Sequence, residues 1–104
     1  MKSFKIKGQL WKVIYKKVVK DDEGNLCFGL TDKDQRKIYV EKNLKGDQLK
    51  LVLFHEYCHA LFFELHLSLD HNLEEVIVDG FSSTIYRQFS MVYRKRIKSD
   101  PYQK

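Results

Sequence analysis

Residues 49–65 read LKLVLFHEYCHALFFEL. Wound into a helix, this stretch presents apolar side chains on almost every side, which is typical of a helix that runs through the middle of a core. We expect the helix to begin at Asp47, because an aspartate at this position can accept hydrogen bonds from the amide groups of the first turn. His55, Glu56 and His59 are polar residues within the stretch, and their burial would be costly without partners.

Strands are predicted before this helix and a second helix after it. Polar and apolar residues alternate, or Val, Ile and Tyr accumulate, in short segments separated by polar turns. From Asn72 onwards, apolar residues instead recur at three- and four-residue steps, which indicates a helix that ends before Pro101. The sequence therefore predicts an α+β fold, in which a short N-terminal antiparallel sheet packs on the buried 49–65 helix and on a second, glutamate-bearing helix. The strands are expected at 4–7, 11–19, 26–30 and 36–40.

The composition is that of one globular domain. The chain has 104 residues, of which 43% are hydrophobic and 32% charged, too apolar for a disordered chain and too charged for a membrane protein. We expect one domain over residues 1–93 and a basic tail over 94–104. No apolar run approaches the ~20 residues that span a bilayer, and the N-terminal lysines precede no apolar segment typical of an export signal. We therefore expect a cytoplasmic protein in which Cys27 and Cys58 are reduced thiols.

The net charge of +5 comes from 19 Lys and Arg residues against 14 Asp and Glu residues. The excess lies near the two ends of the chain, where basic residues can meet nucleic acid or an acidic partner. The early lysines alternate with apolar residues, however, as on the solvated face of a sheet, and no nucleic-acid-binding motif accompanies them. We therefore expect neither nucleic acid nor a membrane as a partner.

The segment His55-Glu56-Tyr57-Cys58-His59 matches the metal-binding pattern H-E-x-x-H. Residues four apart lie about 40° apart around a helix, so both imidazoles project from one face, one turn apart. That spacing allows two histidines to bind one Zn²⁺. Glu56 lies about 100° further round, where it can contact a water on the metal but not join both histidines as a ligand. Cys58 points elsewhere and is expected to be a small core residue.

A zinc site of this kind needs a third protein ligand, and the sequence offers His66, His71 and Glu75. His66 is expected at the end of the helix, and His71 in the loop between the helices. Glu75 is preferred because Asp79 follows it by one helical turn and faces the same way. If Glu75 binds the metal, Asp79 can accept the second ring N–H of a ligand histidine, most simply His55.

Glu74 is the rival carboxylate. Its neighbour one turn further on is Val78, which offers no acceptor to a histidine. An acidic residue in the first turn of a helix is also stabilised by the helix dipole. We therefore expect Glu74 to act as an acidic residue of the first turn rather than as a metal ligand.

The H-E-x-x-H pattern at His55 and His59, followed by Glu75 and Asp79 at E-x-x-x-D spacing, resembles the gluzincin clan of zinc metallopeptidases. The chain also resembles small zincin-like proteins encoded by phages and other mobile elements, and the ImmA/IrrE peptidases. The resemblance implies that His55, His59 and Glu75 bind zinc. It further implies that Glu56 is the general base acting on a zinc-bound water, and that Asp79 orients His55.

By this resemblance, which covers residues 37–89, the chain is a hydrolase: a zinc metallopeptidase of narrow specificity with a peptide or protein substrate. If the strand Arg36–Val40 is a sheet edge, an extended substrate can pair with it. The equal alternative is a protected edge, blunted by Arg36, Lys37 and Glu41. Two alternatives stay open: a zinc-binding regulatory or interaction module with little turnover, and a basic nucleic-acid-associated protein with a structural metal. The residue that stabilises the oxyanion is left open among His71, Tyr86, Arg87 and Tyr93.

Overall fold

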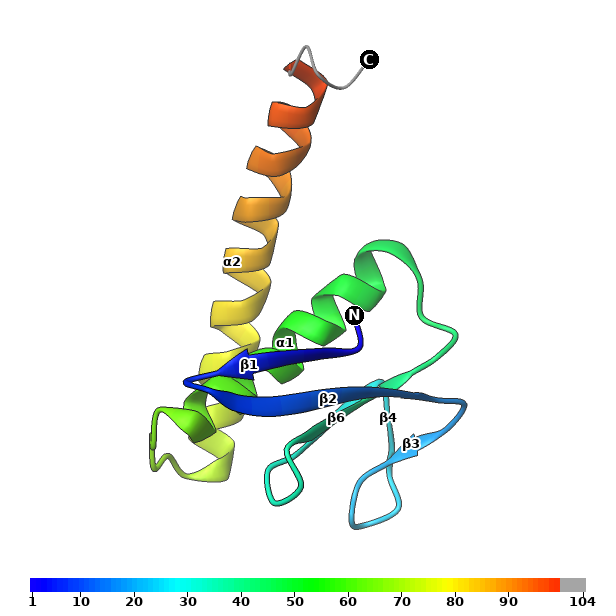
Figure 1. Ribbon diagram of the computed structural model, residues 1–104, viewed down its shortest axis with the longest axis vertical. Helices are drawn as coiled ribbons and strands as arrows, with labels where there is room; N and C mark the ends of the chain where they lie inside the picture. The colour runs from blue at the N-terminus through cyan, green and yellow to red at the C-terminus, as the bar shows by residue number, and fades with distance from the viewer. Residues whose placement is uncertain (100–104) are drawn as a thin grey trace.

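Strands come first and helices second in this computed structural model (Figure 1), which confirms the α+β class. The structure describes the backbone of residues 1–99 and the side chains of residues 1–88. Tyr93 and the basic tail expected over 94–104 therefore lie outside the described side chains. The elements are β1 (Ser3–Ile6), β2 (Gln9–Lys16), β3 (Val19–Lys20), β4 (Leu26–Cys27), β5 (Gly29–Asp32), β6 (Lys37–Glu41), α1 (Gly46–Glu64) and α2 (His71–Ser99).

The main sheet is mixed, so the expectation of an antiparallel sheet is wrong for its central pair. Its strand order is β1-β2-β6-β5, and β2 and β6 run parallel, whereas β1 with β2 and β5 with β6 are antiparallel. The cause lies in the connection after β2. The chain leaves β2 through the short β3–β4 ribbon and enters the sheet again as β5, leaving a space that β6 fills as it turns back.

This topology also corrects the expected substrate strand. Arg36–Val40 corresponds to β6, which is paired on both sides and is not an edge of the sheet. The edges are β1 and β5. A strand whose amide and carbonyl groups are already paired on both sides cannot accept an added strand, so β6 cannot bind a substrate in this way.

The start of α1 differs from the expectation as well. Asp47 is not the N-cap: the cap is Lys45, which makes no side-chain capping bond. Gly46 opens the helix with φ of +60°, a left-handed conformation that glycine adopts at no steric cost. Asp47 consequently lies in the first turn, and its Oδ1 accepts a hydrogen bond of 3.2 Å from the Tyr86 hydroxyl on α2. It therefore helps to join the two helices.

The core lies between the sheet and α1, and α2 packs against α1. Cys58 is 1% exposed and belongs to the buried apolar residues, as expected, and both Cys27 and Cys58 are free. Neither helix, over its described residues, is long and apolar enough to cross a bilayer. The buried cluster consists of Ile6, Trp11, Val13, Ile38, Val40, Leu44 and Ala60.

A charged group at the end of α1 ties this helix to the sheet. Glu64, 5% exposed, accepts hydrogen bonds from Trp11 Nε1 at 3.2 Å and from Arg36 Nε and Nη2 at 3.0 and 3.2 Å. The hydrogen bonds from Arg36 lower the pKa of Glu64 below its ordinary value. The ionised carboxylate therefore stabilises the folded chain at neutral pH, and this stabilisation is lost as the pH falls through the lowered pKa.

Glu64→Gln is accordingly expected to lower the thermal unfolding midpoint at pH 7 by several degrees, because the Arg36 guanidinium loses its charged partner. The difference from the wild type should shrink below about pH 4.3, where this carboxyl begins to take up a proton in the unfolded chain, and it should vanish as the pH falls through the lowered pKa of the folded chain. Thermal melts followed by circular dichroism at pH 7 and at pH 3.5 measure both effects, with the exposed Glu23→Gln as control. Equal midpoints for Glu64→Gln and the wild type at pH 7 would contradict this account.

Candidate metal centre

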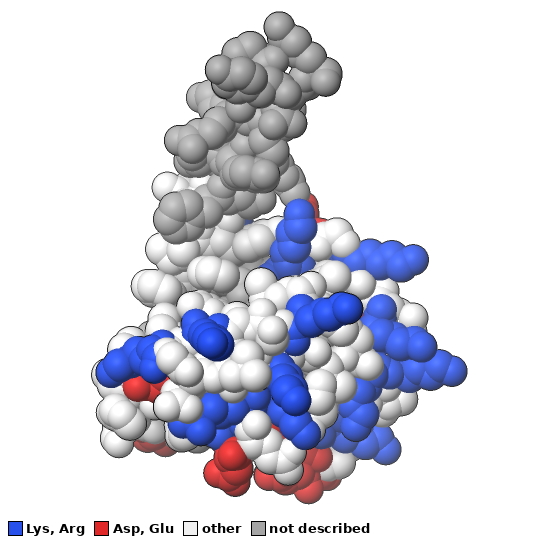
Figure 2. All heavy atoms as spheres, in the orientation of Figure 1, with Lys and Arg blue, Asp and Glu red and all other residues white. Residues whose placement is uncertain are grey.

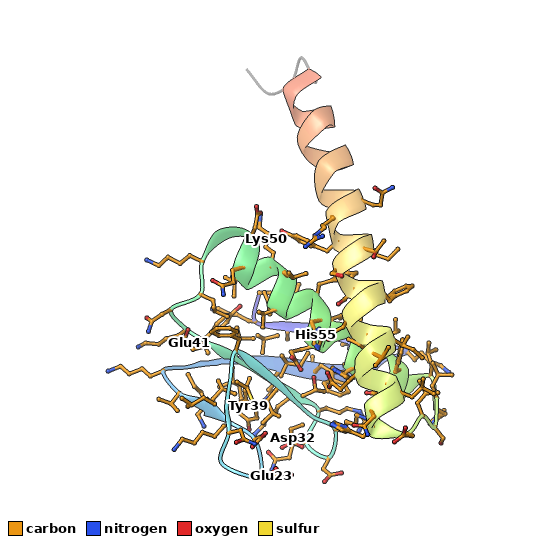
Figure 3. The ribbon with its side chains drawn as sticks, turned by 180° about the vertical axis from the view of Figure 1, so that it is seen from behind. Glu23, Asp32, Tyr39, Glu41, Lys50 and His55 are labelled. Atoms are coloured by element: carbon orange, nitrogen blue, oxygen red, sulfur yellow. The ribbon has the colours of Figure 1, made fainter. Side chains whose placement is uncertain are left out.

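The two helices bring His55, His59 and Glu75 together where α1 crosses the start of α2. His59 Nε2 lies 3.0 Å from Glu75 Oε1, and His55 Nε2 lies 3.7 Å from Glu75 Oε2. One nitrogen or oxygen from each side chain falls within 4.8 Å of the others, so the group can hold a metal ion. Figure 3 shows His55 on α1, facing α2. These are the residues that the sequence pattern singles out as metal ligands.

The other nitrogen of each imidazole also faces a carboxylate. His55 Nδ1 lies 3.4 Å from Asp79 Oδ1, the contact that the E-x-x-x-D spacing predicts. His59 Nδ1 lies 2.5 Å from Glu74 Oε2. A carboxylate can only accept a hydrogen bond, so a metal ion bound to both Nε2 atoms would leave the ring protons on Nδ1, facing Asp79 and Glu74.

Glu74 therefore has a role that the sequence interpretation missed. It is buried between His59 and Lys33, whose Nζ lies 3.4 Å from Glu74 Oε2. Burial raises the pKa of Glu74, but the hydrogen bond from His59 and the charge of Lys33 outweigh this effect, and the net pKa is lowered. The sequence held one clue to this contact. Later residues on α1 meet earlier residues on α2, so the carboxylate that faces His59 precedes Asp79, the carboxylate that faces His55.

The donor set suits Zn²⁺. Two imidazole nitrogens and one carboxylate oxygen are the ligands of one common class of catalytic zinc site, which leaves a coordination position open. The described residues that can hold a metal include neither His66 nor His71. His66 is exposed just after the end of α1. His71 is the first residue of α2, not a loop residue as expected.

Glu56 lies beside the three ligands and does not join them. It is only 8% exposed, and its Oε1 accepts a hydrogen bond of 2.7 Å from the Thr31 hydroxyl. Burial raises the pKa of Glu56, while the hydrogen bond from Thr31 and the nearby His55 oppose this effect. The carboxylate is therefore held in one orientation by β5, in an environment that favours uptake of a proton more than water does.

A cavity of about 400 Å³ joins these groups. Of the expected electrophiles, His71 lines the cavity, whereas Tyr86 binds Asp47 and lines a separate apolar pocket. Arg87 is exposed and is not among the residues around the cavity, and Tyr93 is outside the described side chains. The residues around the cavity are Asp21, Cys27, Gly29, Leu30, Thr31, Lys33, His55, Glu56, His59, His71, Glu74 and Glu75.

Glu74→Ala and Asp79→Ala are each expected to weaken Zn²⁺ binding by about 10–100-fold, because each substitution removes the group that orients one imidazole. Competition titrations against a chromophoric chelator measure the affinity. Glu23→Ala, in the turn between β3 and β4, is the control and should bind zinc like the wild type. Unchanged affinity in Glu74→Ala would show that the contact with His59 does not support a metal site.

No family model, curated protein or solved structure matches this chain. The candidate metal centre therefore rests on the geometry of the described residues. That geometry has three parts: a set of three ligands, a carboxylate facing the outer nitrogen of each histidine, and a buried glutamate beside them.

Proposed function

We propose that this chain is a zinc-dependent metallopeptidase of the gluzincin type, a small phage-like zincin. One observation carries the proposal: His55 and His59 direct Nε2 at the two oxygens of one carboxylate and Nδ1 at two others. A purely structural role for the histidines would need one hydrogen-bond acceptor for each imidazole, not a third carboxylate between them. A shared metal ion accounts for Glu75 as well as for both histidines.

His55, His59 and Glu75 are the residues that would hold the ion. Zn²⁺, when bound there, supplies Lewis acidity toward a water and toward the scissile carbonyl. Glu56 takes the proton from the attacking water and passes it to the leaving amine. The Thr31 hydroxyl already donates a hydrogen bond to Oε1 of Glu56. This leaves Oε2 as the oxygen that receives the proton.

The substrate path follows β5, the sheet edge beside Glu56. The Phe28 carbonyl accepts a hydrogen bond from the Glu41 amide on β6. Because backbone groups alternate in direction along an antiparallel pair, those of Gly29 and Thr31 face the open edge. A peptide that adds to this edge as a further strand would pass directly over Glu56. We therefore propose β5, not β6, as the strand that binds the substrate.

Because Gly29 has no side chain, Glu56 can pack closely against β5 at this position. A Cβ at this position would lie 2.8 Å from Glu56 Cγ and 2.8 Å from Val52 Cγ1. Gly29→Ala is therefore expected to displace Glu56. The rate of peptide hydrolysis should fall by about 10-fold or more, and the free energy of unfolding by about 1–3 kcal/mol. Urea unfolding and hydrolysis of a quenched-peptide pool measure the two effects.

Gly80→Ala is the matched control, because a Cβ at Gly80 meets nothing within 4 Å and alanine is favoured over glycine inside a helix. It should keep the wild-type activity and unfold at the same or a higher urea concentration. A fully active Gly29→Ala protein would contradict the proposed position of Glu56 relative to the substrate.

The proposal is tested by the metal content of the purified protein and by its hydrolysis of the quenched-peptide pool. We expect about one Zn²⁺ per chain, with hydrolysis abolished by 1,10-phenanthroline and restored by added Zn²⁺. A protein that takes up no metal at neutral pH, or one whose hydrolysis resists the chelator, would overturn the proposal. Tight zinc binding with no cleavage of any peptide in the pool would favour the regulatory zinc module instead.

A further inference from the structure

The outer face of the main sheet has a different composition from the inner one. The side chains that alternate inward, among them Trp11, Val13, Ile38 and Val40, are buried against α1. Neither helix packs on the opposite face in the described chain, because α1 lies on the inner face and α2 lies on α1 (Figure 1). By the same alternation, the outward side chains are Ser3, Lys5, Leu10, Lys12, Ile14, Lys16, Leu30, Asp32, Lys37, Tyr39 and Glu41.

Strand pairing brings lysines of three strands onto this outer surface. Lys12 on β2 lies beside Lys37 on β6, and Lys5 extends the surface on β1. Like charges on directly neighbouring strand positions destabilise a sheet. Only part of the positive charge on this surface is offset: Asp32 is the neighbour of Lys37 on its other side, and Glu41 is the neighbour of Lys16. Figure 2 shows Lys and Arg side chains gathered over the body in the region where Figure 1 draws β1 and β2.

An aromatic side chain lies among these lysines. Tyr39 is half-buried on β6, next to Ile14 on β2, and Lys16 Nζ lies 5.1 Å from the centre of its ring. Figure 3 labels Tyr39 and Asp32 on the side of the sheet away from α1. The surface therefore combines positive charge with an aromatic ring on one face of a sheet. We call Lys5, Lys12, Lys16, Lys37 and Tyr39 the lysine face.

We propose that the lysine face binds single-stranded nucleic acid. Its lysines carry the charge opposite to that of the phosphates. A tyrosine on a sheet provides a ring on which an unpaired base can stack. A single strand fits better than a duplex, because the face is a sheet surface with no helix that could enter a groove. It also fits better than a membrane, because Ile14 and Tyr39 lie between the lysines and are only partly exposed.

This inference goes beyond the proposed peptidase and does not depend on it, since the lysine face and the metal centre lie on opposite sides of the sheet. It also revises the expectation from the sequence, which favoured a merely solvated face. The lysines do alternate with apolar residues, but the strand order places those of β1, β2 and β6 beside one another.

Fluorescence anisotropy with a fluorescein-labelled single-stranded oligonucleotide of about 20 nucleotides, long enough to cover one binding face, tests the proposal on the full chain. We expect log K to fall with log salt with a slope of about −3, from four lysines at about 0.7 each. Lys12→Glu with Lys37→Glu should raise Kd by about 10-fold or more, since two phosphate contacts are lost and two repulsive charges added. Tyr39→Ala should weaken binding with little change in the salt slope, because stacking releases no counterions.

The control is Lys45→Glu with Lys50→Glu, which changes the net charge equally at the start of α1, an exposed position away from the lysine face. It should raise Kd by less than about 3-fold, through long-range charge alone. If the Lys12→Glu, Lys37→Glu protein does not fold, as judged by circular dichroism, Lys12→Gln with Lys37→Gln takes its place.

Four results with nucleic acid would overturn the proposal: no binding at low salt, equal losses in both double variants, tighter binding of a duplex, or equal displacement by polyglutamate. Binding to phosphatidylserine vesicles but not to the oligonucleotide would overturn it as well.

Discussion

Glu56→Gln is expected to lower kcat/KM for peptide hydrolysis by about 10²–10⁴-fold, the usual contribution of a general base. The glutamine side chain has nearly the same shape and can still accept the hydrogen bond that Thr31 makes to Oε1. It cannot take a proton from water at pH 7. The protein should therefore keep its fold and its zinc and lose only turnover, as measured by metal analysis and by hydrolysis of the quenched-peptide pool.

Glu23→Gln is the control for this experiment, because Glu23 is an exposed residue of the turn between β3 and β4. Full turnover in Glu56→Gln would show that Glu56 is not the general base, and it would contradict the proposed peptidase mechanism. Loss of zinc from Glu56→Gln would instead identify Glu56 as a ligand, and the proposed division of roles between Glu56 and Glu75 would be wrong.

Glu75→Ala is expected to weaken Zn²⁺ binding by more than about 100-fold, because the loss of a group that merely orients a ligand already costs about 10–100-fold. Glu75 is the carboxylate that faces Nε2 of both His55 and His59. Its removal leaves two ligands, too few for a stable zinc site. Metal analysis of the purified protein and competition titrations measure the loss.

His71→Ala is the matched control, because His71 lines the same cavity but is absent from the group that can hold a metal. It should bind zinc like the wild type. The opposite result, zinc lost with His71→Ala and kept with Glu75→Ala, would move the third ligand to the start of α2 and exclude the gluzincin arrangement. Oligonucleotide binding in Glu75→Ala should stay at the wild-type level, so the two proposals fail separately.

Local patterns were sufficient for much of this structure. The apolar stretch around His55 and His59 forms the helix that it predicts, and the three- and four-residue repeat forms α2. Four-residue spacings also placed His55 beside His59 and Glu75 beside Asp79, because residues one turn apart on a helix are neighbours in any fold. The α+β class and these two pairs within the helices were therefore predictable from the sequence.

Pairings between distant segments were not predictable in this way. The parallel pairing of β2 with β6 makes β5 the edge beside Glu56, and it places Lys12 beside Lys37. The contact of Glu74 with His59 depends on the angle at which α2 crosses α1. Alternation along a strand shows which side chains share a face, and helical spacing shows which share a turn. Neither shows which strands become neighbours or how two helices cross, because the path of the connecting chain and the packing of the core determine both.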